Sequence, residues 1–420
     1  MSDTLPFASD ILLVATAGLA VIVAQRVGAL TRVPFSALVL ALTAIVAAAV
    51  PGFHRPSATT VERVVTVALV AVLFAGGMGM GGRRFASAAG PILALGLAGT
   101  FATAGLLAAF IHYAFGLAWY PALLVATAVS PTDPTVVFSV LGRRPVPGRS
   151  GAILEGESGA NDPVGIALMA GLIGGRGISG SGLSHAAWTF FLQMSVGAVI
   201  GVAGGYGLLW LMRHAPLPGS GLDPIRTLVA AFLLYGLATL ARGSGFLAVF
   251  VGGIVIGDHD VARKAEIEHF HDALGSLGEM AAFVALGLTV HLQVVGRLDV
   301  WAPGLAVGAV TAFAVRPIVA RICLSGAHLS VPERRFIQFA GLKGAVPILL
   351  GTYLLTTGLA DTARLYGIVV VVVVFSVVVQ GGLVGPAISV LHLDSVPADR
   401  SENRPRRGGP GQPRRRWPSR

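Results

Sequence analysis

The sequence predicts an all-α integral membrane protein of about thirteen transmembrane helices, forming two inverted-topology repeats with crossed discontinuous helices. The first observation is composition: hydrophobic residues make up 54% and charged residues 12% of the 420 residues, whereas a soluble domain averages about 25% charged residues. The second is a series of apolar windows, most of them long enough to cross a bilayer. The third is that two of these windows are interrupted at matching places by proline, glycine and charge.

Thirteen apolar windows follow one another along the chain. They lie at about 11–26, 35–51, 62–80, 89–113, 119–141, 150–174, 186–212, 224–241, 244–258, 270–290, 301–322, 335–357 and 365–391. The ninth window is short, so its boundary with the eighth is the least sharply defined. The 56 glycines of the chain are typical of membrane helices that approach one another closely.

The windows predict the domain organisation. We expect a transmembrane domain over residues 1–393, in which repeats at about 9–175 and 224–391 are linked by the span at 186–212. The single cysteine, Cys323, excludes a disulfide framework.

The segment 394–420 differs from the rest of the chain. It contains eight arginines, is rich in proline and glycine, and lacks apolar periodicity, so we expect a disordered tail. A basic tail can bind nucleic acid, but attachment to anionic lipid on the cytoplasmic face is the favoured interpretation. We therefore expect membrane lipids, and no nucleic acid, as its partners.

Basic residues predict the orientation. Loops after odd-numbered windows carry more of them, such as Arg83 and Arg84 after the third window, than loops after even-numbered windows. The N-terminus contains Asp3 and Asp10 without the basic region of a cleavable signal peptide. By the positive-inside rule, we expect the N-terminus outside and the C-terminus in the cytoplasm.

The fifth and twelfth windows are the interrupted ones. The fifth contains Ser130-Pro-Thr-Asp-Pro134, and the twelfth contains Gly341-Leu-Lys-Gly-Ala-Val-Pro347. Proline removes a backbone donor and clashes with the preceding turn, so neither helix is expected to be continuous. The two windows are seven apart, and this odd offset gives them opposite orientations, as an inverted repeat requires.

Paired interrupted helices indicate a binding site at the membrane midplane of a secondary transporter. We expect Asp133 to neutralise positive half-helix ends and Lys343 to offset negative ones. The alternative is that proline and glycine merely kink two membrane helices.

The sixth window carries polar residues inside an apolar stretch, Glu155-Gly-Glu157-Ser158-Gly-Ala-Asn161-Asp162. Such acids are rarely kept in a membrane without a function. Helical spacing places Glu155, Ser158 and Asp162 on one face, and Glu157 and Asn161 on a neighbouring face. The alternatives are that the acids line a water-filled path or form structural pairs.

These residues predict a cation site. Asp162 and Ser158, with the unwound backbone near Thr132, can supply the oxygen ligands that a small cation prefers. We expect Glu157 to pair with Lys343, because an unpaired buried charge is costly, and Asn161 to brace the site by hydrogen bonding. One carboxylate that holds either a proton or a cation favours one-for-one exchange.

The motifs resemble those of the NhaP-type monovalent cation/proton antiporters. Besides the three motifs above, Phe283-Val-Ala-Leu-Gly287, Phe375-Ser376 and Gln380-Gly381 are similar to that family. The resemblance covers essentially the whole membrane region. It implies the antiporter fold and a homodimeric, non-enzymatic exchanger of Na⁺ or K⁺ for H⁺ in the bacterial inner membrane, without a cofactor.

The resemblance also implies residue roles. Asp162 would bind the cation and the proton, Thr132 and Ser158 would help to coordinate the metal ion, and Asn161 would be the neutral partner typical of electroneutral members. We also expect Asp133 to take part in binding the cation and the proton.

Three features depart from the family pattern. The family usually has arginine where this chain has Lys343, and relatives often carry an acid in the third span, where this chain reads Phe74-Ala-Gly-Gly77. A folded cytoplasmic regulatory domain is not expected beyond the short tail.

Two further polar residues lie in apolar windows. Glu279 and Arg316 are expected to pair with each other or to face a cavity, with the structural role favoured. The rival functional classes are a cation channel lined by the same acids and a transporter of organic or anionic solutes.

Overall fold

The computed structural model describes residues 18–19, 22–24, 26, 35–49, 55–134, 137, 149–175, 177–217 and 221–390. Throughout these ranges the chain is helical or irregular, without a strand. Most of the first predicted span and the whole arginine-rich tail lie outside the described residues.

In the described part of the chain, helices occupy the second to thirteenth apolar windows, except at window ends and at two breaks over residues 129–133 and 340–344. Their bounds are α2 (Phe35–Ala49), α3 (Ala58–Leu93), η1 (Ala94–Gly99), α4 (Thr100–Phe115), α5 (Trp119–Ala128), α7 (Ser150–Gly175), α8 (Gly180–His214), α9 (Leu222–Leu240), α10 (Gly245–Asp258), α11 (Lys264–Thr289), α12 (Leu292–Val295), α13 (Leu298–Val310), η2 (Thr311–Val315), α14 (Arg316–Cys323), α15 (Val331–Phe339), α16 (Ala345–Leu354), α17 (Thr362–Phe375), η3 (Ser376–Gln380) and α18 (Gly381–Val390). The three η segments are π-helical turns inside longer helices.

The lengths of these helices fit a membrane. In the described part of the chain, six continuous helical segments are long and apolar enough to cross a bilayer, and α2, α5, α10 and α16 are shorter apolar helices. Many large apolar side chains on the outside are exposed, such as Trp188, Phe191 and Trp210 on α8. The prediction of an all-α integral membrane protein is confirmed.

One boundary differs from the sequence prediction. A loop was expected between the third and fourth windows, around Arg83 and Arg84, but α3 continues as a helix to Leu93 and leads directly into η1 and α4. The chain changes direction at Gly81, whose φ of 63° and ψ of 159° are not helical. Glycine has no Cβ and adopts this conformation readily, so a kink replaces the loop.

The helices can be divided into two groups, which also meet where α3 packs on α7. A first group, which we call the scaffold group, contains α2, α3, α9, α10 and α11, with α3 packed along both α10 and α11. A second, the core group, contains α4, α5, α7 and α13 to α17, in which α4 packs on α5 and α13 on α17. The long helix α8 packs on α7 of the core group and on α9 and α10 of the scaffold group.

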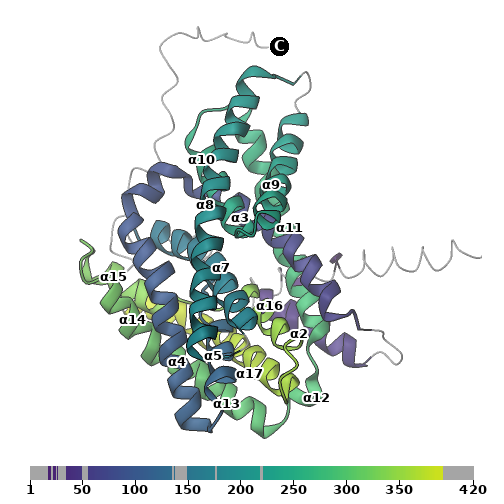
Figure 1. Ribbon diagram of the computed structural model, residues 1–420, viewed down its shortest axis with the longest axis vertical. Helices are drawn as coiled ribbons and strands as arrows, with labels where there is room; N and C mark the ends of the chain where they lie inside the picture. The colour runs from purple at the N-terminus through teal and green to yellow at the C-terminus, as the bar shows by residue number, and fades with distance from the viewer. Residues whose placement is uncertain are drawn as a thin grey trace, which may run out of the picture.

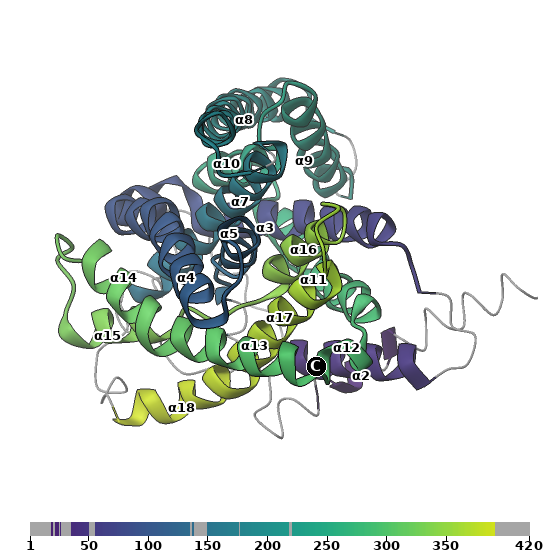
Figure 2. The ribbon, with the colours of Figure 1, turned by 60° about the horizontal axis from the view of Figure 1, so that its bottom comes forward.

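The figures show this arrangement. Figure 2 shows α8 and α9 along one edge of the molecule and α13 and α18 along the opposite edge, with α3, α5, α7 and α16 between them. Figure 1 likewise shows α9 and α10 towards one end and α13 towards the other. The two breaks are buried, at residues 129–132 and 340–344, so their irregular backbone is shielded from lipid.

Small residues allow the close contact between α3 and α10. A Cβ atom added at Gly253 of α10 would lie 2.5 Å from the carbonyl oxygen of Phe74, closer than any side chain tolerates. This contact matters for the site, because α3 and α10 both contribute to the wall of a large polar cavity of about 530 Å³.

Candidate functional site

The two interrupted helices meet at their breaks. Helix α5 ends at Ala128, and the chain is not helical again until Pro134; on the other side, α15 ends at Phe339 and α16 begins at Ala345. The backbone N–H of Asp133 donates a hydrogen bond of 2.8 Å to the carbonyl oxygen of Leu342. The structure thus brings the two predicted breaks into direct backbone contact.

The closeness of this crossing depends on glycine. A Cβ atom added at Gly344 would overlap the side-chain carboxylate of Asp133. The last span also stabilises the second break: Ser376 Oγ accepts a hydrogen bond of 3.0 Å from the backbone N–H of Lys343. Gln380 accepts from Ser376 and donates to the carbonyl oxygen of Phe339, with distances of 3.0 and 2.8 Å. Ser376 and Gln380 therefore position the second break.

Lys343 neutralises the end of the other interrupted helix. Its buried Nζ donates hydrogen bonds of 2.9 and 3.1 Å to the carbonyl oxygens of Ser130 and Pro131. These carbonyls lie just beyond the C-terminus of α5, where a helix carries partial negative charge. An ammonium group with several donors suits two converging carbonyl oxygens.

The expected ion pair between Glu157 and Lys343 is absent, and Glu157 pairs with Arg316 instead. Arg316 Nη2 donates to Glu157 Oε2 at 2.8 Å, and its Nη1 donates to Oε1. A guanidinium matches a carboxylate with two parallel hydrogen bonds, which a single ammonium cannot do. Of the two options for Arg316 and Glu279, the pair does not form, because the carboxylate of Glu157 holds Arg316, whereas Glu279 does face a cavity.

Thr132 and Asn161 complete this buried network. Asn161 Nδ2 donates to Thr132 Oγ1 at 2.8 Å, and Thr132 Oγ1 donates to Glu157 Oε1 at 3.3 Å. The network joins α7, the first break and α14. Arg316 in an apolar window was the sequence signal for it, although the sequence did not identify its partner.

Two cavities lie on different sides of α7. A cavity of about 530 Å³ is lined by Glu155, Ser158 and Asp162, and one of only about 10 Å³ is lined by Glu157 and Asn161. The two faces that helical spacing predicted for the sixth window are therefore the two faces that the structure presents. Thr132 and Lys343 line the small cavity, so the three predicted metal ligands Asp162, Ser158 and Thr132 are not gathered around one opening.

The larger cavity is acidic. The carboxylates that line it are Asp133, Glu155, Asp162, Asp272 and Glu279, and Arg84 is the one basic residue among the described lining residues. Arg84 Nη2 lies 3.4 Å from Glu155 Oε2, and both side chains are partly exposed. A cleft lined by charge of one sign concentrates ions of the opposite sign, so the cavity favours cations.

Asp162 is a buried acid in the wall of this cavity. Its side chain is buried, as is Ser158 one turn earlier. Asp133 acts on it with like charge and Lys343 with opposite charge. Carboxylate and hydroxyl oxygens of this kind can bind a monovalent cation or, at Asp162, a proton.

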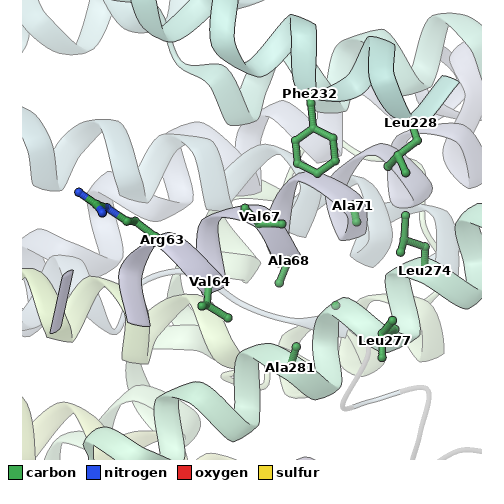
Figure 3. A pocket seen from close by; sticks show the side chains of 11 residues that line it. Arg63, Val64, Val67, Ala68, Ala71, Leu228, Phe232, Leu274, Leu277 and Ala281 are labelled. Carbon is green, nitrogen blue, oxygen red and sulfur yellow. The ribbon is translucent and has the colours of Figure 1, made fainter. Parts of the chain in front are cut away.

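A second large cavity has no such chemistry. It has a volume of about 430 Å³ and lies between α3, α9 and α11 (Figure 3). Its described lining is apolar except for Arg63, whose side chain points away from the other labelled residues in Figure 3. It therefore offers no ligands for a small cation.

Comparison with known proteins agrees with this geometry. The family described as "Sodium/hydrogen exchanger, transmembrane" matches residues 11–390 of the chain. The chain belongs to the sodium/hydrogen exchanger family. The resemblance to NhaP-type antiporters is thereby confirmed.

Relatives of this exchanger-family chain are named as antiporters of monovalent cations and protons. It is 32% identical over 338 residues to the K⁺/H⁺ antiporter NhaP of Alkalimonas amylolytica, covering 78% of the chain and 57% of the relative. It is 27% identical to the Na⁺/H⁺ antiporter NhaH of Halobacillus dabanensis, covering 72% of the chain and 76% of the relative. The chain spans less than three-fifths of the length of the K⁺/H⁺ antiporter relative.

A solved structure shares the fold. The sodium proton antiporter MjNhaP1 of Methanocaldococcus jannaschii is 20% identical and superposes with a TM-score of 0.75, covering 92% of this chain and 99% of that one. The exchanger-family chain therefore has the antiporter fold that the resemblance implied.

Proposed function

We propose that this protein exchanges a monovalent cation, Na⁺ or K⁺, for a proton across a membrane. The observation that carries the proposal is the position of Asp162, which is buried in the wall of an acidic cavity that Asp133 of the first break also lines. A single acid there can hold a cation or a proton in turn. The names of the relatives, which include both K⁺/H⁺ and Na⁺/H⁺ antiporters, support the same reaction class.

The roles of the neighbouring residues follow from their contacts. Ser158 adds a hydroxyl oxygen beside Asp162, and the first break presents Asp133 and backbone next to it. Asn161 is neutral and holds Thr132 by a hydrogen bond, so these two side chains add no charge to the site. With Glu157 and Arg316 compensating each other, one cation replaces one proton and exchange is electroneutral.

Alternating access follows from the two packed groups. The open cavity lies between the scaffold helices α3 and α11 and the core helices α7 and α16, while the other side of α7 is filled by the Glu157 network. Movement of the core group against the scaffold group would close the first path and open the second. Opening only one path at a time is what distinguishes an exchanger from a channel.

The remaining proposals concern the membrane, the oligomeric state and the orientation of the protein. We place the protein in the bacterial inner membrane as a homodimer, with its C-terminus in the cytoplasm, as the distribution of arginines favours. The wide cavity is lined by Glu155 near the start of α7 and by Gly79 and Arg84 of α3. In this orientation it faces the cytoplasm. The exchanged ions are the substrates, so the reaction requires no cofactor.

The test is a cation jump in vesicles that contain the purified protein and a pH-sensitive dye. Wild-type protein is expected to collapse a preset pH gradient only when Na⁺ or K⁺ is added. Asp162→Asn keeps the size of the side chain but removes the exchangeable charge, so the rate should fall to that of protein-free vesicles.

Glu155→Gln is the matched control, because Glu155 shares a face of α7 with Asp162 but lies partly exposed beside Arg84. It should retain most of the activity. Full exchange by Asp162→Asn would contradict the proposal, and current flow without a counter-gradient would indicate a channel.

A further inference from the structure

Glu279 on α11 has a buried carboxylate oxygen without a partner. Its Oε1 makes no hydrogen bond within the described part of the chain. An ionised carboxylate withdrawn from water costs several kcal/mol unless a proton or a cation compensates it. Arg316, the basic residue considered as its partner from the sequence, is held by Glu157. Among the described residues no side-chain cation pairs with Glu279, so we look to a proton or a bound cation to balance its charge.

The carboxylate belongs to the acidic cavity. Asp272, Ser276 and Glu279 all line it, and their spacing of four and three residues places them along one face of α11. The adjacent part of α3 contributes Ala75 and Gly76 to the same wall. Helix α11 thus supplies the buried acid on the scaffold side, opposite Asp162 on the core side.

Asp133 connects the two acids. It lines the same cavity, and its negative charge acts on both Glu279 and Asp162. Of the other titratable groups that face the cavity, Arg84 is engaged with Glu155 and Asp272 is exposed. Two neighbouring carboxylates in a confined space repel each other unless a proton or a cation lies between them.

We propose that Glu279 and Asp133 form a second binding site for the transported monovalent cation, between the cavity mouth and Asp162. Carboxylate oxygens are suitable ligands for such a cation, and a proton takes its place when the site is empty of metal. This inference rests on the proposed exchange reaction. It adds that the scaffold group also binds the ion and delivers it to the acid of the core group.

The first test separates cation affinity from maximal rate. Glu279→Gln keeps the size of the side chain and removes the charge, so the half-saturating Na⁺ or K⁺ concentration should rise about tenfold. The rate at saturating cation should change little, because Asp162 remains. Glu279→Asp should restore much of the affinity, and Glu155→Gln should leave it unchanged. An unchanged half-saturating concentration in Glu279→Gln would overturn the second site.

The second test measures binding without transport. A ligand that binds the folded state raises the unfolding temperature with its concentration. In detergent, Asp162→Asn should still be stabilised by added Na⁺ or K⁺ relative to choline, and Asp162→Asn/Glu279→Gln should not. Absence of cation-dependent stabilisation in Asp162→Asn would contradict the inference. If Glu279→Gln does not fold, Asp133→Asn replaces it, and wild-type cation affinity in that variant would count against the site.

The two proposals can fail separately. If wild-type vesicles show no cation-dependent proton movement, the exchange reaction is wrong, and the thermal measurement still decides whether the second site exists. If wild-type protein exchanges and Asp162→Asn does not, but Glu279→Gln keeps wild-type affinity, only the second site is wrong.

Discussion

Individual charges in the interior are balanced by groups on other helices. Glu157 of α7 is held by Arg316 of α14, and Lys343 of the second break is held by carbonyl oxygens of the first. Each contact crosses between elements far apart in sequence. The charged residues therefore fix how these elements sit relative to one another.

The pair of Glu157 and Arg316 should contribute strongly to stability. Arg316→Met leaves a buried carboxylate without its bidentate partner, and breaking such a pair costs about 3–5 kcal/mol. The thermal unfolding midpoint in detergent should fall by several degrees. Arg297→Met, which removes one of the two arginines that pair with the exposed Asp299, is the control and should change the midpoint little. Equal midpoints for the two variants would contradict a structural role for the buried pair.

At the scale of elements, the two interrupted helices form one unit. The first break is joined to the second by the hydrogen bond from Asp133 to Leu342. The second break is supported by Ser376 and Gln380 of η3, in a π-helical turn that gives the last span its irregular geometry. A change at the crossing should therefore affect the site more than the same change inside a regular helix.

Gly344→Ala tests this dependence. The added methyl group would occupy the position of the Asp133 carboxylate, so the crossing must open or Asp133 must move. Exchange in vesicles should fall at least about tenfold, as expected when a reacting group is displaced by a fraction of an ångström to an ångström. Gly105→Ala in α4 adds the same methyl group where nothing lies within 4 Å and should keep full activity. Wild-type exchange by Gly344→Ala would show that the crossing tolerates a wider separation.

At the scale of the whole molecule, the structure has one wide path and one closed path. The 530 Å³ cavity opens beside α3, α7 and α11, and the network around Glu157 leaves about 10 Å³ on the other side. Under the proposed exchange reaction, this asymmetry corresponds to one of the two states that alternating access requires. With the orientation proposed from the arginines, the wide path would face the cytoplasm.

Thiol labelling checks this orientation. In a Cys323→Ser background, which removes the single cysteine, Ser276→Cys places a thiol on the cavity wall. A membrane-impermeant maleimide should label it in inside-out vesicles and not in intact cells. Tyr113→Cys, at the exposed end of α4, should show the opposite pattern. Labelling of Ser276→Cys from outside alone would reverse the proposed direction of the cavity.

The sequence by itself determined most of the membrane helices, the two breaks and the two faces of the sixth span, but not the continuation of α3 past the kink at Gly81. These features are local, because hydropathy, proline and helical spacing act over a few residues. The tertiary structure decided the partners. Glu157 lies 159 residues from Arg316, and Lys343 lies 213 residues from Ser130. Sequence showed that each charge needed compensation, but the packing of distant helices selected which group supplied it, and it left Glu279 facing the cavity.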